Sequence, residues 1–112
     1  MKQQLREPKE KEIQSQILEW LRWNKVYCWK MNNSAVYIKS KDRYMKSPMR
    51  GVADILGIIN GGTFLAIEVK AKKGKLSEFQ IEFLDNITKN GGIAFCARCL
   101  EDVKLSLKPY FI

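Results

Sequence analysis

The sequence contains no histidine. This absence excludes Ser-His-Asp and Cys-His catalysis and every zinc site with imidazole ligands. Three cysteines are present, an odd number in a chain whose start does not resemble a secretion signal, so we expect reduced thiols. Cys96 and Cys99 have C-x-x-C spacing, but no second pair completes a structural zinc site. If the chain is an enzyme, carboxylates, lysine and a bound hard cation must supply its chemistry.

Long hydrophobic runs are also absent. No apolar stretch approaches the ~20 residues that a membrane-spanning helix needs. The polar first residues, MKQQLREPKEKE, fit neither a secretory signal nor a transit peptide. A length of 112 residues suits one domain, with residues 1–8 as a flexible leader. We therefore expect a soluble cytoplasmic protein that forms a single domain over residues 1–112 and has no membrane partner.

The order of secondary-structure patterns predicts an α/β fold. Apolar residues at helical spacing predict a helix over 9–24 that buries Ile13, Ile17, Trp20 and Leu21. Ser77 and Gln80 form a capping box that begins a second helix, which ends at Gly91 and Gly92. Strands are expected at 26–31, 36–39, 52–59, 63–70 and 93–98, and a last helix at 100–107. This order, roughly αβββαβα, predicts a small mixed β-sheet flanked by helices, with a polar turn-forming segment over 40–51.

One acid and one base end the apolar strand that reads LAIEVK. Glu68 and Lys70 are two residues apart and so share one face of the strand. The NGG turn joins this strand to the preceding one as an antiparallel hairpin. Asp54 lies near the start of the preceding strand, so the hairpin places it beside Glu68 and Lys70. Two carboxylates and a lysine suit a Mg²⁺ site for phosphodiester hydrolysis. The alternative is a structural Asp54 and a surface ion pair, but both acids border apolar runs, where unpaired charge is costly.

The first helix carries a third acid that can face this site. At ~100° per residue, Glu10 and Gln14 lie on the inward stripe, whereas Glu12 does not. Alternatively, Glu10 only interacts with the dipole at the helix N-terminus. Gln80 likewise has two compatible interpretations, as a capping residue or as a polar contact near the site.

Net charge is +8, from 20 Lys and Arg against 12 Asp and Glu, which favours a polyanionic partner such as nucleic acid. Basic residues gather before Asp54 and after Lys70, so they should flank the acids as a DNA backbone requires. The alternative is a pair of solvated loops. The candidate DNA-binding residues are Lys39, Lys41, Arg43, Lys46, Arg50, Lys72, Lys73 and Lys75.

Four segments resemble the VRR-NUC family of virus-type replication-repair nucleases, a branch of the PD-(D/E)xK superfamily. EKEIQSQI resembles the helix signature E-x-x-I-Q, which corresponds to Glu10 and Gln14. GVAD is similar to G-x-P-D and ends in Asp54, although Ala53 stands where the family has proline. FLAIEVKAKKGKLSEFQ resembles I-E-V-K-x-x-x-G-x-x-S-x-x-Q and supplies Glu68, Lys70 and Gln80. NGGIAFCARCLEDV resembles the strand and short helix that close the domain.

The resemblance implies a restriction-endonuclease-like fold and dependence on Mg²⁺ or Mn²⁺. It implies that Asp54, Glu68 and the main-chain carbonyl of Val69 bind the metal, with Glu10 as a further candidate ligand, and that Lys70 assists the attacking water. The resemblance also implies a compact phage or bacterial DNA-repair protein that acts on branched DNA, with a homodimer that resolves four-way (Holliday) junctions as one possibility within the family.

Two alternatives to a nuclease that cuts branched DNA remain open at this point. One is a nuclease of the same superfamily that acts on flaps, nicks or linear duplex. The other is a basic nucleic-acid-binding module without catalysis.

Five aromatic residues are candidates for a dimer interface, although aromatic residues at such spacings are more often part of the core. These candidates are Trp20, Trp23, Trp29, Tyr37 and Tyr44.

Overall fold

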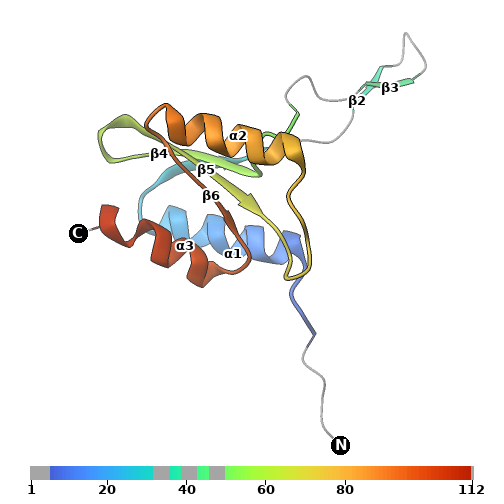
Figure 1. The fold of residues 1–112 in the computed structure, drawn as a ribbon. Helices are drawn as coiled ribbons and strands as arrows, with labels where there is room; N and C mark the ends of the chain where they lie inside the picture. The colour runs from blue at the N-terminus through green and yellow to red at the C-terminus, as the bar shows by residue number, and fades with distance from the viewer. Residues whose placement is uncertain (1–5, 32–35, 39–42, 46–49, 112) are drawn as a thin grey trace, which may run out of the picture.

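The computed structural model describes residues 6–31, 36–38, 43–45 and 50–111, the two short middle stretches by their backbone alone. These described residues form three α-helices and two sheets, whose arrangement can be followed in Figure 1. The helices are α1 (Glu10–Trp23), α2 (Glu78–Lys89) and α3 (Leu100–Leu107). The strands are β1 (Tyr27–Lys30), β2 (Val36–Ile38), β3 (Arg43–Met45), β4 (Ile55–Ile59), β5 (Thr63–Val69) and β6 (Ile93–Ala97). Short 3₁₀ turns cover Asn60–Gly62 and Lys108–Tyr110.

The main sheet is mixed and has the strand order β1-β4-β5-β6. Strand β4 pairs antiparallel with β1 and β5, whereas β5 and β6 run parallel. The NGG turn joins β4 to β5 as a hairpin in which Ile59 lies opposite Thr63 and Ile55 opposite Ile67. The predicted antiparallel pairing of these two strands is therefore confirmed, and so is the small mixed sheet.

A second, two-stranded sheet differs from the sequence expectation. Strand β2 pairs antiparallel with β3, which lies inside the segment 40–51 that the sequence pattern assigns to a polar turn. Three residues, RYM, leave too little alternation for a strand pattern to stand out among charged neighbours.

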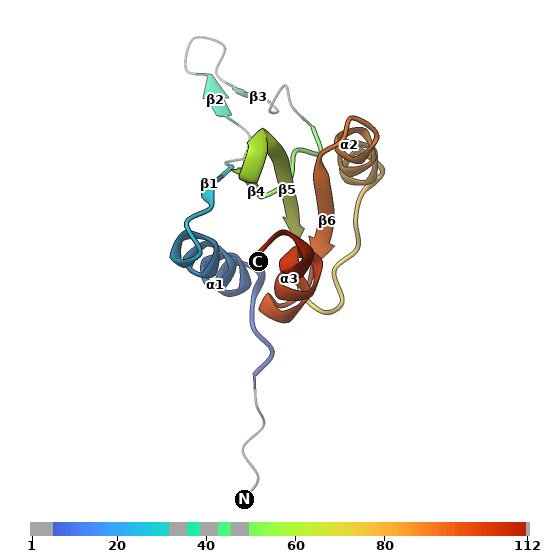
Figure 2. The same cartoon turned by 90° about the vertical axis from the view of Figure 1, so that its left-hand side faces the viewer.

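Helices cover both faces of the main sheet, with α1 and α3 on one face and α2 on the other (Figure 2). Strand β5 is buried from Leu65 to Val69. Its odd-numbered residues Leu65, Ile67 and Val69 pack in the cluster that α1 and α3 complete. Ala66 packs in the cluster of α2, so Glu68, two residues further along the strand, points toward the α2 face.

The predicted boundaries of the two longer helices are confirmed. Helix α1 buries Ile13, Gln14, Ile17, Leu18 and Leu21 toward the sheet. Trp20 is half-buried and its ring centroid lies 5.5 Å from that of Phe111. Helix α2 begins with a complete capping box, because Ser77 Oγ accepts from Gln80 N at 3.2 Å and Gln80 Oε1 accepts from Ser77 N at 2.8 Å. It ends at Lys89, with Asn90 as the C-cap, and Gly91 follows with φ 88°.

The aromatic candidates for an interface fall into different environments. Trp23 is 85% exposed, whereas Trp29 is half-buried against the α2-side core. Tyr37 and Tyr44 lie opposite each other in the backbone of β2 and β3, but their side chains lie outside the described part of the chain. Within that part, no helix is long and apolar enough to cross a membrane.

Candidate metal centre

Asp54 lies immediately before β4 and contacts the end of β5. Its Oδ2 accepts a hydrogen bond of 2.9 Å from the Val69 amide, two residues beyond the last β4–β5 pair. The amide of Lys70 points to the other side, since it donates to Ala97 O of β6 at 3.1 Å. A trans peptide places its carbonyl opposite its N–H, so the Val69 carbonyl points away from β6 and toward Asp54. The structure thus brings together Asp54 and the predicted carbonyl ligand.

Glu68 is the most deeply buried acid of the described chain, at 2% exposure. Gln80 Nε2 donates to its Oε1 at 3.0 Å, whereas its Oε2 receives no hydrogen bond from any described residue. Burial and, after it, the charge of the neighbouring Asp54 together raise the pKa of Glu68 to about 8. Lys70 opposes this shift and Glu10 adds to it.

These carboxylates fit a divalent cation. The charge of Asp54 makes ionisation of Glu68 costly, and the buried Oε2 of Glu68 has no hydrogen-bond partner among the described residues, so this oxygen is available as a ligand atom. Across the described ranges, no three His, Cys, Asp or Glu side chains form a ready ligand cluster. Mg²⁺ commonly takes only one or two carboxylates and completes its shell with water, phosphate and carbonyl oxygens. The donor set of two carboxylates and one carbonyl therefore suits Mg²⁺ better than a metal that needs a full protein cage.

Glu10 and Lys70 meet around the loop that follows β5. Glu10 Oε1 accepts a long hydrogen bond of 3.4 Å from the Ala71 amide. A Cβ atom added to Gly74 would lie 3.3 Å from both Glu10 Oε1 and Lys70 Cδ, so these two side chains pass close to the same glycine. Glu10 thus faces the end of β5, as the helix phase predicts. Glu12 points elsewhere and forms an ion pair with Arg6 at 2.8 Å.

Gln14 lies one turn after Glu10 on the inward face of α1. It is 8% exposed, and its Oε1 has no hydrogen-bond partner among the described residues. A buried amide oxygen without a donor costs about 1–3 kcal/mol. Gln14 is therefore inward-facing as predicted, and it offers an acceptor that the described protein atoms leave unused.

Gly51 explains how the chain approaches Asp54. Its φ is 79°, and an added Cβ would lie 2.2 Å from Phe79 O in the first turn of α2. Only glycine fits this position, which holds the segment before Asp54 against α2. Ala53, which stands in place of the family's proline, is fully buried in the α2-side core.

Gln80 combines both of its predicted roles. Its Oε1 completes the capping box with Ser77, while its Nε2 holds Glu68. The first turn of α2 thereby donates the hydrogen bond that orients the buried carboxylate.

The candidate DNA-binding residues are only partly located. Lys72, Lys73 and Lys75 are exposed on the loop between β5 and α2, with Lys72 Nζ 4.0 Å from Glu7 Oε1. Arg50 is exposed and its guanidinium lies 5.4 Å from the centre of the Phe79 ring. Lys39, Lys41 and Lys46 lie outside the described residues, and so does the side chain of Arg43 in β3.

Arg98 is the residue at this end of the sheet that sequence reasoning missed. Its Nη1 donates to the carbonyls of Ala71 and Gly74 at 2.8 and 2.7 Å. No sequence pattern marks an arginine that binds main-chain carbonyls 24 to 27 residues earlier in the chain. Its neighbour in sequence, Cys99, is exposed, and all three cysteines are free thiols.

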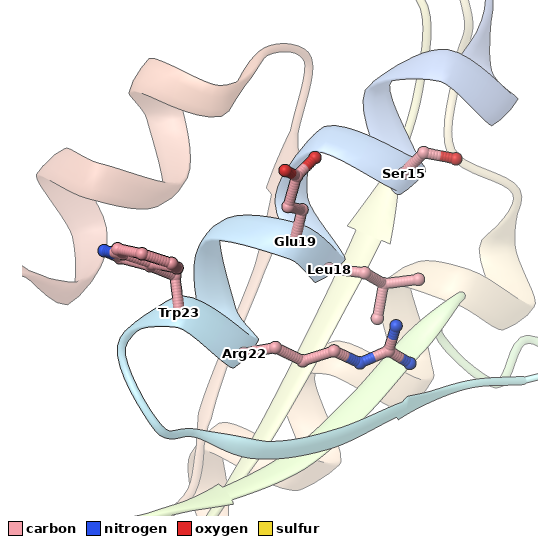
Figure 3. A pocket seen from close by; sticks show the side chains of 5 residues that line it. All are labelled: Ser15, Leu18, Glu19, Arg22 and Trp23. Atoms are coloured by element: carbon pink, nitrogen blue, oxygen red, sulfur yellow. The ribbon is translucent and has the colours of Figure 1, made fainter.

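A pocket on the outer surface of α1 is separate from the acids. Figure 3 shows the side chains that line it, which project from successive turns of this one helix. They are Ser15, Leu18, Glu19, Arg22 and Trp23. With a single carboxylate, this pocket does not offer the donor set that a hard cation needs.

Comparison with known proteins agrees with this geometry. The model of the VRR-NUC domain matches residues 7–99, which is most of the chain. No match is found among the curated proteins. A solved structure described as a VRR_NUC domain protein has a TM-score of 0.66 and 20% sequence identity, and the match covers 94% of this chain and 89% of that one. At this identity the solved structure supports the fold alone. The extent of the domain match shows that the chain belongs to the VRR-NUC family and is a nuclease of the PD-(D/E)xK kind.

Proposed function

We propose that this protein is a metal-dependent endonuclease that hydrolyses phosphodiester bonds in branched DNA, with four-way (Holliday) junctions as its substrate. The observation that carries the proposal is the pair of half-buried Asp54 and buried Glu68, in which Glu68 Oε2 has no hydrogen-bond partner among the described residues, beside Lys70 and a lysine-bearing loop. We also propose that residues 1–112 form one nuclease domain. Its setting is the bacterial cytoplasm, in DNA repair, with a bacterial or phage source.

Each residue of the site has a distinct task in this proposal. Asp54, Glu68 and the Val69 carbonyl would hold Mg²⁺ or Mn²⁺, with Glu10 as a further candidate ligand. When bound there, such a cation would supply Lewis-acid chemistry for phosphodiester hydrolysis. Lys70 orients the attacking water or offsets negative charge that develops on the phosphate oxygens. Gln80 fixes the rotamer of Glu68, and Gln14 supports the site from α1.

The surface next to these residues suits a DNA backbone. Lys72, Lys73 and Lys75 are exposed on the loop that follows Lys70, directly after the strand that carries Glu68. Arg50 is exposed in the segment that precedes Asp54, close to the first turn of α2. Cationic side chains at such positions bind phosphates without reading base sequence. Specificity for branched DNA must then come from shape, which a two-fold homodimer with two sites would supply.

Cleavage assays with matched variants test the proposal. Wild type, Asp54→Asn and Lys70→Ala are incubated with labelled four-way junction, flap, nicked and linear duplex DNA, in Mg²⁺, Mn²⁺ or EDTA. We expect wild type to cut the junction only with metal, and both variants to bind it without cutting. Binding without cleavage by wild type in every metal would support a non-catalytic module. Equal cutting of linear duplex would remove the claim of branched specificity.

A pair of acids on one helix provides the internal control. Glu10→Gln should impair cleavage, because Glu10 contacts the loop after β5. Glu12→Gln should have little effect, because it removes only an exposed ion pair with Arg6. The reverse pattern would contradict the assignment of Glu10.

Sedimentation at several protein concentrations, with and without junction DNA, tests the homodimer. A monomer that stays monomeric on the junction would exclude paired cleavage by two sites of one dimer. In that case flaps or nicks, which need one cut, become the better substrates.

A further inference from the structure

Residues 71–75, which we call the lysine loop, have few means of holding one conformation. The loop contains no helix or strand and exposes Lys72, Lys73 and Lys75. Like charges this close repel one another, and Gly74 adds backbone freedom. Within the loop, one turn is closed by the Gly74 amide, which donates to Ala71 O at 3.0 Å.

Arg98 holds this turn from outside the loop. Its Nη1 donates to Ala71 O at 2.8 Å and Gly74 O at 2.7 Å, with Lys72 O further away at 3.3 Å. The two short bonds join the first residue of the turn to its last. A planar guanidinium with several fixed N–H donors suits such bridging, whereas the single ammonium of lysine does not.

The backbone of Arg98 is itself fixed. It follows Ala97, which is fully buried at the end of β6 and accepts from the Lys70 amide at 3.1 Å. Its own amide donates to Asp102 Oδ2 at 2.8 Å in the first turn of α3. Arg98 therefore reaches the lysine loop from a fixed corner of the sheet, next to the strand that carries Glu68.

Glu10 contacts the same loop on its amide side. Its Oε1 accepts from Ala71 N, while Arg98 binds Ala71 O, so two side chains from different elements hold the two polar groups of one residue. Gly74 lies close to Glu10 Oε1 and Lys70 Cδ. The loop conformation is in this way tied to the candidate metal centre.

We propose that Arg98 is a positioning residue for DNA binding. It fixes the lysine loop so that Lys72, Lys73 and Lys75 present their charges together to the phosphates beside Lys70, and it does so through carbonyls rather than by contacting DNA. This inference rests on the proposed nuclease function for its effect on DNA. Its effect on the loop itself does not depend on that function.

The first test uses hydrogen exchange and needs no DNA. Amide exchange at Gly74 should become at least about tenfold faster in Arg98→Ala and Arg98→Lys, because the bridge that closes the turn is lost. Arg22→Ala, an exposed arginine on α1, is the matched control and should leave Gly74 unchanged. Unchanged exchange in both Arg98 variants would overturn the proposal, whatever the protein does with DNA.

The second test measures junction binding and cleavage, with thermal unfolding as a check that each variant folds. Arg98→Ala should raise the Kd and KM for four-way junction DNA about tenfold, while kcat at saturating DNA changes by less than about twofold. Arg98→Lys should behave like Arg98→Ala, because charge alone does not bridge the carbonyls. Full rescue by lysine would instead indicate a direct phosphate contact and overturn the proposal.

A mutant cycle separates positioning from an independent contact. In the background Lys72→Ala, Lys73→Ala and Lys75→Ala, the Arg98→Ala change should weaken binding by less than about twofold, because the charges that it positions are gone. If Arg98→Ala weakens DNA binding as much in this background as in wild type, Arg98 contributes to binding independently of the lysines, which would overturn the proposal. If wild type binds no DNA at all, the proposed function fails, and the exchange data alone decide the role of Arg98 in the loop.

Discussion

Binding of Mg²⁺ should release a proton from Glu68. Burial and the charge of Asp54 raise the pKa of this carboxyl to about 8, so the metal-free protein holds a proton there at neutral pH. A cation binds the ionised carboxylate, and the proton must therefore leave when the metal enters. The perturbation is a titration of the protein with Mg²⁺ at a series of pH values.

The size of the effect follows from the pKa. At pH 7 a group with a pKa of about 8 is about nine-tenths protonated, so about 0.9 proton should leave for each cation bound. The apparent affinity at pH 7 should be about tenfold below its plateau, and about a hundredfold below it at pH 6. Above pH 8 the affinity should level off, because the carboxylate is already ionised.

Isothermal titration calorimetry in two buffers of different ionisation enthalpy counts these protons directly. Glu68→Gln should show no proton release and much weaker binding, whereas Glu12→Gln should match wild type. An affinity that stays constant between pH 6 and pH 8, with no protons exchanged, would refute both the raised pKa and the role of Glu68 as a ligand.

The same shift fixes the sign of a stability effect in the metal-free protein. The folded pKa lies above the unfolded value of 4.5, so the folded state binds the proton more tightly and stability falls as the pH rises from about 4.5 to about 8. In EDTA, Glu68→Gln should be more stable than wild type by a few kcal/mol at pH 8.5, and this gain should vanish near pH 4.5. Urea unfolding at the two pH values measures the difference.

Two further predictions concern the backbone around the site. Gly51→Ala should lower the free energy of unfolding by about 3 kcal/mol or more, because the added Cβ would lie 2.2 Å from Phe79 O. Gly61→Ala is the control: Gly61 has a similar φ of 80° but no atom within 4 Å of an added Cβ, so this change should lower the free energy of unfolding by only about 1 kcal/mol. Equal losses in urea unfolding would show that the contact with α2 is unimportant. Ser77→Ala should cost about 1 kcal/mol by removing the N-cap of α2, and an unchanged unfolding midpoint would argue against the capping box.

Local rules carried much of the prediction from sequence. A two-residue period and a short turn were enough to bring Asp54 to the end of β5, and helix phase separated Glu10 from Glu12. The capping box and its following glycine defined α2 at both ends. These features depend on residues close together in the chain, where spacing determines geometry.

Features that depend on distant parts of the chain were not predictable in this way. Arg98 binds carbonyl groups, which every residue carries, so its targets leave no mark on the sequence. The pKa of Glu68 depends on how deeply β5 is covered and how near Asp54 lies, and neither is a property of spacing. Strand β3 is too short for its alternation to be distinguished from a turn.

The double use of Gln80 makes the candidate metal centre and the start of α2 one thermodynamic unit. A single side chain closes the helix cap on Ser77 and holds Glu68, so fraying of the first turn releases the carboxylate as well. Linkage between two equilibria is reciprocal, and a cation that immobilises Glu68 must equally suppress that fraying. Amide hydrogen exchange at the beginning of α2 should then slow as the site fills with metal, so its rate would report metal occupancy without any measurement at the site itself.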